Sequence, residues 1–183
     1  MKKFELTSEF NLNFFGRKFF RIKALVNIER YGVKAGDLGG WVEKEDNLSQ
    51  SGNAWVSSNA KVSGDAWVSG NAKVSGDAVV SGNAKVYGDA VVSGDAVVSG
   101  DAEVSGDADY AVIKGFGTVY RPTTFFRCHD GEARVTCGCF YGTIDEFREQ
   151  VKRTRKGKVA DEYLKIADLM EYHFKEEDSG ENV

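Results

Sequence analysis

The sequence contains few residues of several types, and each shortage argues against a class of protein. Among its 183 residues there are one proline, Pro122, three cysteines and two histidines. No apolar run approaches the roughly 18 residues that a transmembrane helix needs, so we expect no membrane span. The opening residues MKKFELTSEF contain two lysines but no apolar segment behind them, so we expect no secretory signal.

Charge and cysteine content set further expectations. Cys128, Cys137 and Cys139 lie in a chain without an export signal, so we expect reduced thiols in a cytoplasmic protein. The chain carries 24 Lys and Arg residues against 28 Asp and Glu residues, for a net charge of −4. Residues 49–109 hold three basic and eight acidic groups. This acidic balance argues against nucleic acid as a partner of that region.

Glycine, in contrast, is abundant, and in the middle of the chain it recurs within a six-residue repeat. Alanine returns every six residues from Ala54 to Ala108, and valine does so from Val56 to Val104. Six is a multiple of the strand period of two but not of the helical period of 3.6. Each unit therefore predicts a short Ala-x-Val strand with alanine and valine pointing inward, followed by a Ser-Gly-Asp/Asn corner.

This spacing resembles the hexapeptide-repeat family, in which a small residue follows the valine-type position by four residues, as Ala66 follows Val62. The resemblance implies a left-handed parallel β-helix in which three hexapeptides form one triangular coil. Nine units then imply three coils, or four if residues 38–48 form an imperfect first one. We predict a mainly β protein with an N-terminal hairpin cap at 1–37, the β-helix at 38–109 and a C-terminal ββαα module at 110–183.

The flanking segments carry strand, turn and helix signals. Residues 10–25 predict two strands around a turn at Gly16, and the glycines of GDLGGWV at 36–42 are interpreted as turn geometry. A phosphate-binding loop is the alternative there, although the Lys-Ser ending of a P-loop is missing. Residues 123–128 and 133–137 predict a hairpin. A capping box at Thr143 begins a helix that ends at Gly157, and a second helix covers 160–174.

Eighteen residues per coil sort the outward positions of the repeats onto three faces. The first face carries Trp55, Lys73 and Val91, the second Lys61, Val79 and Val97, and the third Trp67, Lys85 and Glu103, with Tyr87 nearby. The second face is the most apolar, so either another subunit or the terminal segments of the chain are expected to cover it. The hexapeptide resemblance implies homotrimers, which makes Lys61, Val79 and Val97 the candidate subunit interface.

The number and positions of the histidines argue against the enzymatic activities known for this fold. Hexapeptide acyltransferases resemble one another in using a histidine base near the coils, and γ-class carbonic anhydrases bind zinc through three histidines. His129 and His173 both lie outside the repeats, so we predict that the protein is not an enzyme. Cys128, His129, Cys137 and Cys139 could form a zinc site, but buried free thiols are the simpler interpretation. We predict no metal and no cofactor.

The basic run VKRTRKGK at 151–158 has two interpretations. It could be a solvated helix C-terminus whose cations complement the helix dipole, or an anion site for a nucleotide. The exposed aromatic residues of the coils could stack on such a ligand. The candidate ligand-binding or partner-binding residues are Trp55, Trp67, Tyr87, Arg127, Arg148, Arg153, Arg155 and Lys156.

A second resemblance covers nearly the whole chain. Three parts carry this resemblance: the segment GDLGGW, the β-helix and the closing segment TTFFRCHDGEARVTCGCFYGTIDEF. The chain resembles a group of bacteriophage and prophage accessory proteins. This implies a setting in the cytoplasm of an infected or lysogenic bacterium and no particular activity. We expect a non-enzymatic binding protein in counter-defence, which blocks a host protein or sequesters an anionic nucleotide signal. A structural scaffold or virion-associated component is the alternative, and neither membrane nor nucleic acid is an expected partner.

Overall fold

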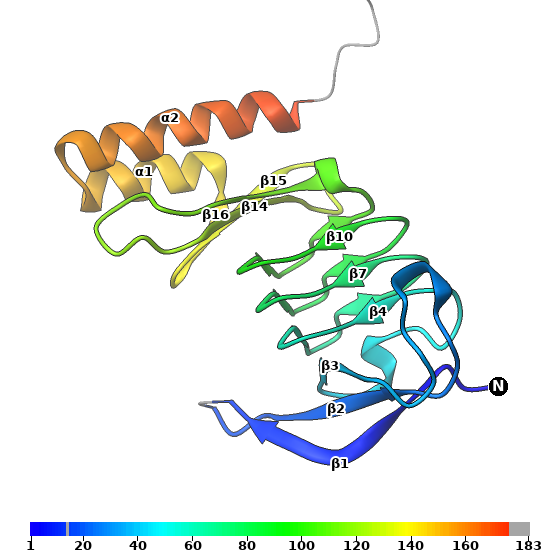
Figure 1. Ribbon diagram of the computed structural model, residues 1–183. Helices are drawn as coiled ribbons and strands as arrows, with labels where there is room; N and C mark the ends of the chain where they lie inside the picture. Colours follow the sequence, from blue (N-terminus) through cyan, green and yellow to red (C-terminus); the bar gives the residue numbers. More distant parts are fainter. Residues whose placement is uncertain (14, 176–183) are drawn as a thin grey trace, which may run out of the picture.

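The hexapeptide repeats form a β-solenoid of about four turns (Figure 1). This computed structural model describes residues 1–13 and 15–175. Each repeat contributes a two-residue strand, and strands eighteen residues apart pair in parallel, as Val62 pairs with Val80 and Val80 with Val98. The nine strands are β4 (Trp55–Val56), β5 (Lys61–Val62), β6 (Trp67–Val68), β7 (Lys73–Val74), β8 (Val79–Val80), β9 (Lys85–Val86), β10 (Val91–Val92), β11 (Val97–Val98) and β12 (Glu103–Val104).

The strands stack into three parallel sheets, one on each face, as the sequence predicts. The first face is β4-β7-β10, the second β5-β8-β11 and the third β6-β9-β12. Residues 38–48 add an imperfect first coil: β3 (Leu38–Val42) pairs with β5, and Leu48, which follows the 3₁₀ turn η2 (Glu45–Asn47), bridges to Val68. The repeated alanines from Ala54 to Ala102 and the valines from Val56 to Val104 fill the interior and are at most 1% exposed. This burial is the hydrophobic stabilisation of the solenoid.

The N-terminal segment forms the predicted hairpin and extends the second face. β1 (Phe4–Leu12) and β2 (Lys18–Ala24) are antiparallel, and β2 pairs with β3, giving a six-stranded sheet in the order β1-β2-β3-β5-β8-β11. The connection from β2 to β3 includes the 3₁₀ turn η1 (Glu29–Tyr31) and folds over the first face. There the Tyr31 hydroxyl donates to the carbonyl of Asn71, and Arg30 pairs with Asp89 at 2.9 Å.

The turn interpretation of the GDLGGWV glycines holds for Gly36, whose φ is 97°. Gly39 and Gly40 instead serve close packing, which corrects that interpretation at these two positions and also its phosphate-loop alternative. Both glycines lie within β3 and are buried. A Cβ on Gly39 would lie 2.6 Å from the carbonyl oxygen of Val56, and one on Gly40 would lie 2.8 Å from that of Ala60. The chain enters the solenoid so close to the next coil that no side chain fits at either position.

The C-terminal module is a four-stranded antiparallel sheet followed by two helices. Its strands are β13 (Tyr110–Ile113), β14 (Thr123–Arg127), β15 (Ala133–Cys137) and β16 (Phe140–Thr143), and its helices are α1 (Ile144–Thr154) and α2 (Gly157–Phe174). The sequence predicted the β14–β15 hairpin and both helices but missed β13 and β16. Thr143 caps α1 as predicted, accepting from the Glu146 amide at 3.1 Å. Gly157 begins α2 rather than ending α1.

The module closes the last coil of the solenoid. Thr124 accepts a hydrogen bond from the amide of Val97 at 2.9 Å, and Thr136 donates to the Val97 carbonyl at 2.7 Å. An antiparallel bridge joins Ala102 to Cys128. The strand edge that a further coil would occupy is thereby hydrogen-bonded, as buried backbone groups require. The helices lie on the side of this sheet that faces away from the solenoid (Figure 1). Over the described ranges, no helix is both long and apolar enough to cross a membrane.

Candidate functional site

The predicted basic residues do not form one cluster, because several are already neutralised. Arg148 pairs with Asp145 at 2.7 Å, Asp168 at 2.9 Å and Glu171 at 2.5 Å. The Arg127 guanidinium lies 3.5 Å from Asp109 and 5.9 Å from the centre of the Phe174 ring. These two side chains hold the helices and the sheet together, and they are not available to an anionic ligand without breaking those pairs.

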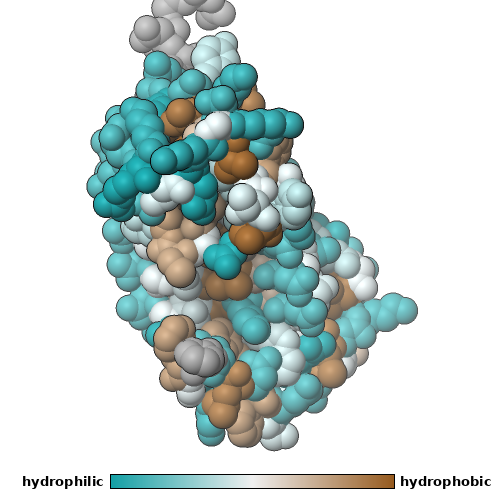
Figure 2. Space-filling model, turned by 90° about the vertical axis from the view of Figure 1, so that its left-hand side faces the viewer, coloured by the Kyte–Doolittle hydropathy of each residue, from teal (hydrophilic) through white to brown (hydrophobic). Residues whose placement is uncertain are grey.

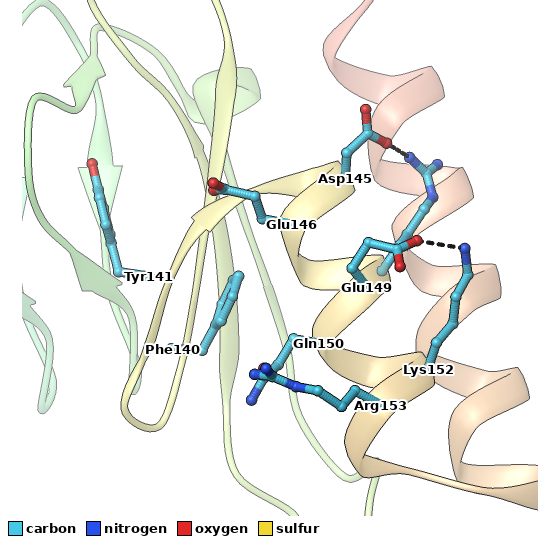
Figure 3. Close-up of a pocket in the computed structure, with 9 residues that line it drawn as sticks. Phe140, Tyr141, Asp145, Glu146, Glu149, Gln150, Lys152 and Arg153 are labelled. Atoms are coloured by element: carbon cyan, nitrogen blue, oxygen red, sulfur yellow. Dashed lines mark hydrogen bonds and ion pairs between the residues drawn. The ribbon is translucent and has the colours of Figure 1, made fainter.

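A depression of the module lies along α1, and its charged side chains are also paired with one another. It has a volume of about 780 Å³, and its wall carries carboxylates as well as cations. Figure 3 shows the pairs that Asp145 and Glu149 make with cations of the same helix as dashed lines. The predicted residue Arg153 lies at this depression, where its guanidinium donates to the side chain of Gln150. A wall of alternating, paired charges does not favour an anion.

A smaller recess of about 220 Å³ has a different lining. It takes Arg121 from the β13–β14 connection, Cys137 and Cys139 from the β15–β16 turn, Arg155 from the end of α1 and Tyr163 from α2. Four segments that are distant in the sequence therefore meet at this point. The recess forms where β16 and α1 pack together and bring the sheet into contact with the two helices.

Aromatic side chains line the apolar part of the recess. Phe147 is 3% exposed, and its ring centre lies 5.5 Å from that of Phe140 and 5.8 Å from that of Tyr163. The Tyr163 hydroxyl donates to the carbonyl of Phe116 at 3.4 Å. Burial, together with the neighbouring Cys137 thiol, raises the pKa of Tyr163. The phenol is therefore a neutral group, and the positive charge of the recess comes from its arginines.

The two arginines of the recess have no acidic partner. Across the residues that the structure describes, the Arg121 side chain makes no hydrogen bond or ion pair, and the Arg155 side chain donates only to the Thr154 carbonyl at 3.2 Å. Both side chains are exposed at the recess, so an anion from solvent can reach them. Arginine also matches the planar, bidentate geometry of carboxylate and phosphate.

The beginning of α2 adds positive potential at the same end of α1. Lys156 occupies the N-cap position of this 18-residue helix without capping it, and the first turn contains no acidic residue. Arg155 and Lys156 thus precede a helix N-terminus, where the dipole already favours negative charge. The interpretation that these cations complement a helix C-terminus holds for Lys152 and Arg153, which lie in the last turn of α1. It also holds for Arg155, the C-cap residue of α1, but not for Lys156, which precedes α2.

The predicted aromatic residues lie elsewhere. Trp55 is 1% exposed, because Ile22 and Gly39 of the N-terminal segment pack against it, so its ring is not available on the surface. Trp67 is 43% exposed on the third face, and Tyr87 is half-buried at a corner of the solenoid. Neither lines the recess.

The candidate interface residues share one surface as predicted. Lys61, Val79 and Val97 are half-buried on successive strands of the second face. The Lys61 ammonium lies 5.9 Å from the centre of the Phe19 ring in β2, so the N-terminal hairpin covers only the lower end of this face. In the side view of Figure 2, apolar residues form a column, interrupted by polar ones, between the C-terminal module and the hairpin.

The thiols and histidines do not converge. Cys128 is 4% exposed within the solenoid core, where burial raises the pKa of its thiol to about 11. Cys137 packs against the separate core of the module. His129 contacts Glu103 at 3.1 Å, and His173 contacts the Ala108 carbonyl at 3.1 Å. In the described part of the chain, no three His, Cys, Asp or Glu side chains are arranged to hold a metal ion.

Arg121, which completes the recess, was not predicted from the sequence. It lies in the connection of residues 114–122, which carries no motif that marks a binding residue. Comparison with known proteins adds no assignment: no family and no curated protein matches this chain. Function is therefore inferred from the fold and from the geometry of the recess.

Proposed function

We propose that the protein is a non-enzymatic binding protein that holds an anionic ligand of nucleotide type in the recess between Arg121 and Arg155. The observation that carries this proposal is the pair of guanidinium groups without acidic partners beside the uncapped N-terminus of α2. A phosphate group can satisfy both arginines at once. The free amides at the N-terminus of α2 follow Arg155 in the chain, outside the lining of the recess, and favour the same negative charge.

The aromatic floor favours a ligand that combines an anion with a flat, apolar part. Phe140 is half-buried and offers a ring surface beside the two cations, on which a nucleobase can stack, while the buried rings of Phe147 and Tyr163 support it from behind. The volume of about 220 Å³ is below the 300–1,000 Å³ of typical ligand sites. A nucleotide would therefore be partly enclosed, which suits a sequestering protein whose ligand remains chemically unchanged.

The test is a binding titration of the full chain against a panel of cyclic and linear nucleotides. We expect at least one to bind with a Kd below the millimolar range, and Arg121→Gln and Arg155→Gln each to weaken that binding by roughly tenfold. Arg153→Gln is the matched control, because Arg153 belongs to the same basic run but lies at the other depression. We expect it to change the Kd less than threefold.

Two results would overturn the nucleotide proposal. One is a Kd weaker than millimolar for every member of the panel. The other is an equal effect of Arg153→Gln and Arg155→Gln, which would mean that binding depends on general positive charge and not on the recess.

The biological setting in this proposal comes from the sequence resemblance to phage and prophage accessory proteins. In that setting the protein would act in counter-defence in the cytoplasm of the bacterial host, removing a nucleotide signal from its receptor. Blocking a host protein is the other form of the same role. In that case we expect the C-terminal module to bind a host protein and not a nucleotide.

A scaffold role is the second candidate, and the second face supports it. The six-stranded sheet continues without a break from β1 to β11, and its outer surface carries Val79 and Val97 beyond the part that the hairpin covers. We propose that this surface joins three copies of the chain, as the hexapeptide resemblance implies. A trimer with no nucleotide binding would favour the scaffold or a virion-associated component over the ligand-binding role.

A further inference from the structure

Cys137 and Cys139 place two thiols in the same recess as the unpaired arginines. They flank Gly138, which begins the two-residue β15–β16 turn with φ 63°, as the first position of a type II′ turn requires. Cys139 is exposed, whereas Cys137 is half-buried and accepts a hydrogen bond from the Thr123 hydroxyl at 3.2 Å. One thiol is open to solvent, and the other lines the same recess two residues away.

We propose that this thiol pair is a thiol–disulfide exchange site that takes an anionic low-molecular-weight disulfide. The inference deepens the proposed function, on which it rests, because the same two guanidinium groups would hold the carboxylates of the disulfide. Arginine binds carboxylate in bidentate geometry, and positive charge around a reactive thiol raises the local concentration of an anionic reagent. The recess thus selects the reagent by charge and presents Cys139 to it.

The exchange balances without any further oxidant. The Cys139 thiolate attacks one sulfur of the small disulfide, whose S–S bond breaks and whose other half leaves as a thiolate and takes up a proton. Cys137 then loses its proton to water and attacks the Cys139 sulfur, displacing the second half as a thiolate. In total, two protein thiols are oxidised to one disulfide and the small disulfide is reduced to two thiols.

The turn geometry allows the internal disulfide. Two residues separated by one other can have Cα atoms no further apart than about 7.6 Å, and a turn shortens this distance. Disulfides need Cα separations of about 4.4–6.8 Å. Gly138 also has no side chain to obstruct the approach of the two sulfurs. Cys128 cannot take part, because it is buried in the solenoid core.

The test compares oxidised glutathione, which is anionic, with cystamine, which is cationic, on the full chain. We expect oxidised glutathione to modify Cys139, identified by peptide mass mapping, and the product to lose the adduct as a Cys137–Cys139 disulfide forms. The Cys137→Ser variant is expected to retain the adduct on Cys139. In the double variant Arg121→Gln/Arg155→Gln, the rate with oxidised glutathione should fall roughly tenfold, while the rate with cystamine should not fall.

An equal rate change for both reagents would overturn the proposal, as would modification at Cys128 alone or an adduct that persists in the wild-type chain. Nucleotide binding is measured separately on the Cys137→Ser/Cys139→Ser variant, whose arginines are intact. Loss of charge selectivity with nucleotide binding retained would refute the exchange site only. Absence of nucleotide binding with charge selectivity retained would refute the nucleotide proposal only.

Discussion

The ammonium group of Lys3 donates a 2.7 Å hydrogen bond to the carbonyl of Ala54 at the open end of the first coil. Only 4% of Lys3 is exposed, and desolvation lowers the pKa of its ammonium group to about 8. Between this value and the ordinary value of 10.5, the unfolded chain binds more protons than the folded one. We therefore expect the free energy of unfolding to rise with pH across this window, by about 1–3 kcal/mol, and to lose this gain as pH falls through 8.

Urea unfolding between pH 7 and 10.5 measures this slope, and Lys3→Met should abolish it. Cys128 lowers the free energy of unfolding as pH rises, because the pKa of its thiol in the folded protein, about 11, lies above the ordinary value of 9.0. Its contribution to stability is complete below pH 9 and is lost as pH rises through 11. Cys128→Ala should therefore steepen the rise above pH 9. A slope that Lys3→Met leaves unchanged would refute the assignment to Lys3.

Ser58 is a strained corner of the solenoid. The corresponding corner residue is glycine in the repeats that follow, whereas Ser58 adopts a φ of 58° with a side chain. A left-handed conformation costs a non-glycine residue roughly 1–2 kcal/mol. We expect Ser58→Gly to raise the free energy of unfolding by about 0.5–1 kcal/mol, because the flexibility of glycine in the unfolded chain offsets part of the gain. Chemical denaturation provides the measurement.

Gly76→Ser is the matched control one coil further along. Gly76 has a φ of 71°, and a Cβ there would lie 2.9 Å from the amide nitrogen of Gly94. We expect Gly76→Ser to lower the free energy of unfolding by more than Ser58→Gly raises it. If Ser58→Gly were neutral or destabilising, the corner at Ser58 would not be strained.

The corner side chains form ladders at 18-residue spacing, and in one of them asparagine separates two aspartates. Asn83 donates to the Asp101 carboxylate at 2.9 Å and occupies the stack between Asp65 and Asp101. Asn83→Asp removes the donor and places like charges about 4.8 Å apart. We expect a loss of about 1 kcal/mol at low ionic strength that shrinks in 1 M salt.

Asn53→Asp tests whether this loss is electrostatic. Asn53 donates to the neutral side chain of Asn71 at 2.8 Å, so its replacement loses a hydrogen bond without facing a carboxylate. Its effect on unfolding should depend less on salt. The same salt response in both variants would argue against repulsion within the Asn83 ladder.

The solenoid was predictable because its side-chain pattern repeats, whereas the recess was not, because its residues meet only after packing. Alanine and valine at fixed spacing set the strand register of the nine repeats. The imperfect first coil at residues 38–48 was open from the sequence, because it lacks the repeat and pairs at an offset of 20 residues instead of 18. Trp55 was misjudged because an outward position is exposed only if no other segment covers it, and the repeat period does not place β2 and β3 against it. Arg121 had no local pattern at all, and two of the three ion pairs that neutralise Arg148 come from α2, twenty or more residues away.

Assembly can be tested on the second face with a change of one side chain. We expect sedimentation velocity to give the wild-type protein the mass of a trimer, and Val79→Asp to reduce it to a monomer, because a carboxylate would be buried without a partner. Val91→Asp is the control, since Val91 is equally half-buried but lies on the first face. A wild-type monomer, or equal dissociation by both variants, would contradict the proposed interface.

A substitution at Lys156 should change stability and ligand binding in opposite directions, because the positive charge of Lys156 opposes the dipole of α2, which it precedes. Lys156→Asp supplies an N-cap acceptor and a negative charge at the start of α2, so we expect the free energy of unfolding to rise by about 1–2 kcal/mol. The same change should weaken nucleotide binding at least fivefold, since the carboxylate would occupy the amides that the phosphate needs. Lys165→Glu, an equal charge change at an exposed position within α2, should alter neither property strongly. If Lys156→Asp stabilises the protein while a nucleotide binds as tightly as before, the N-terminus of α2 does not contact the ligand and binding depends on the two arginines alone.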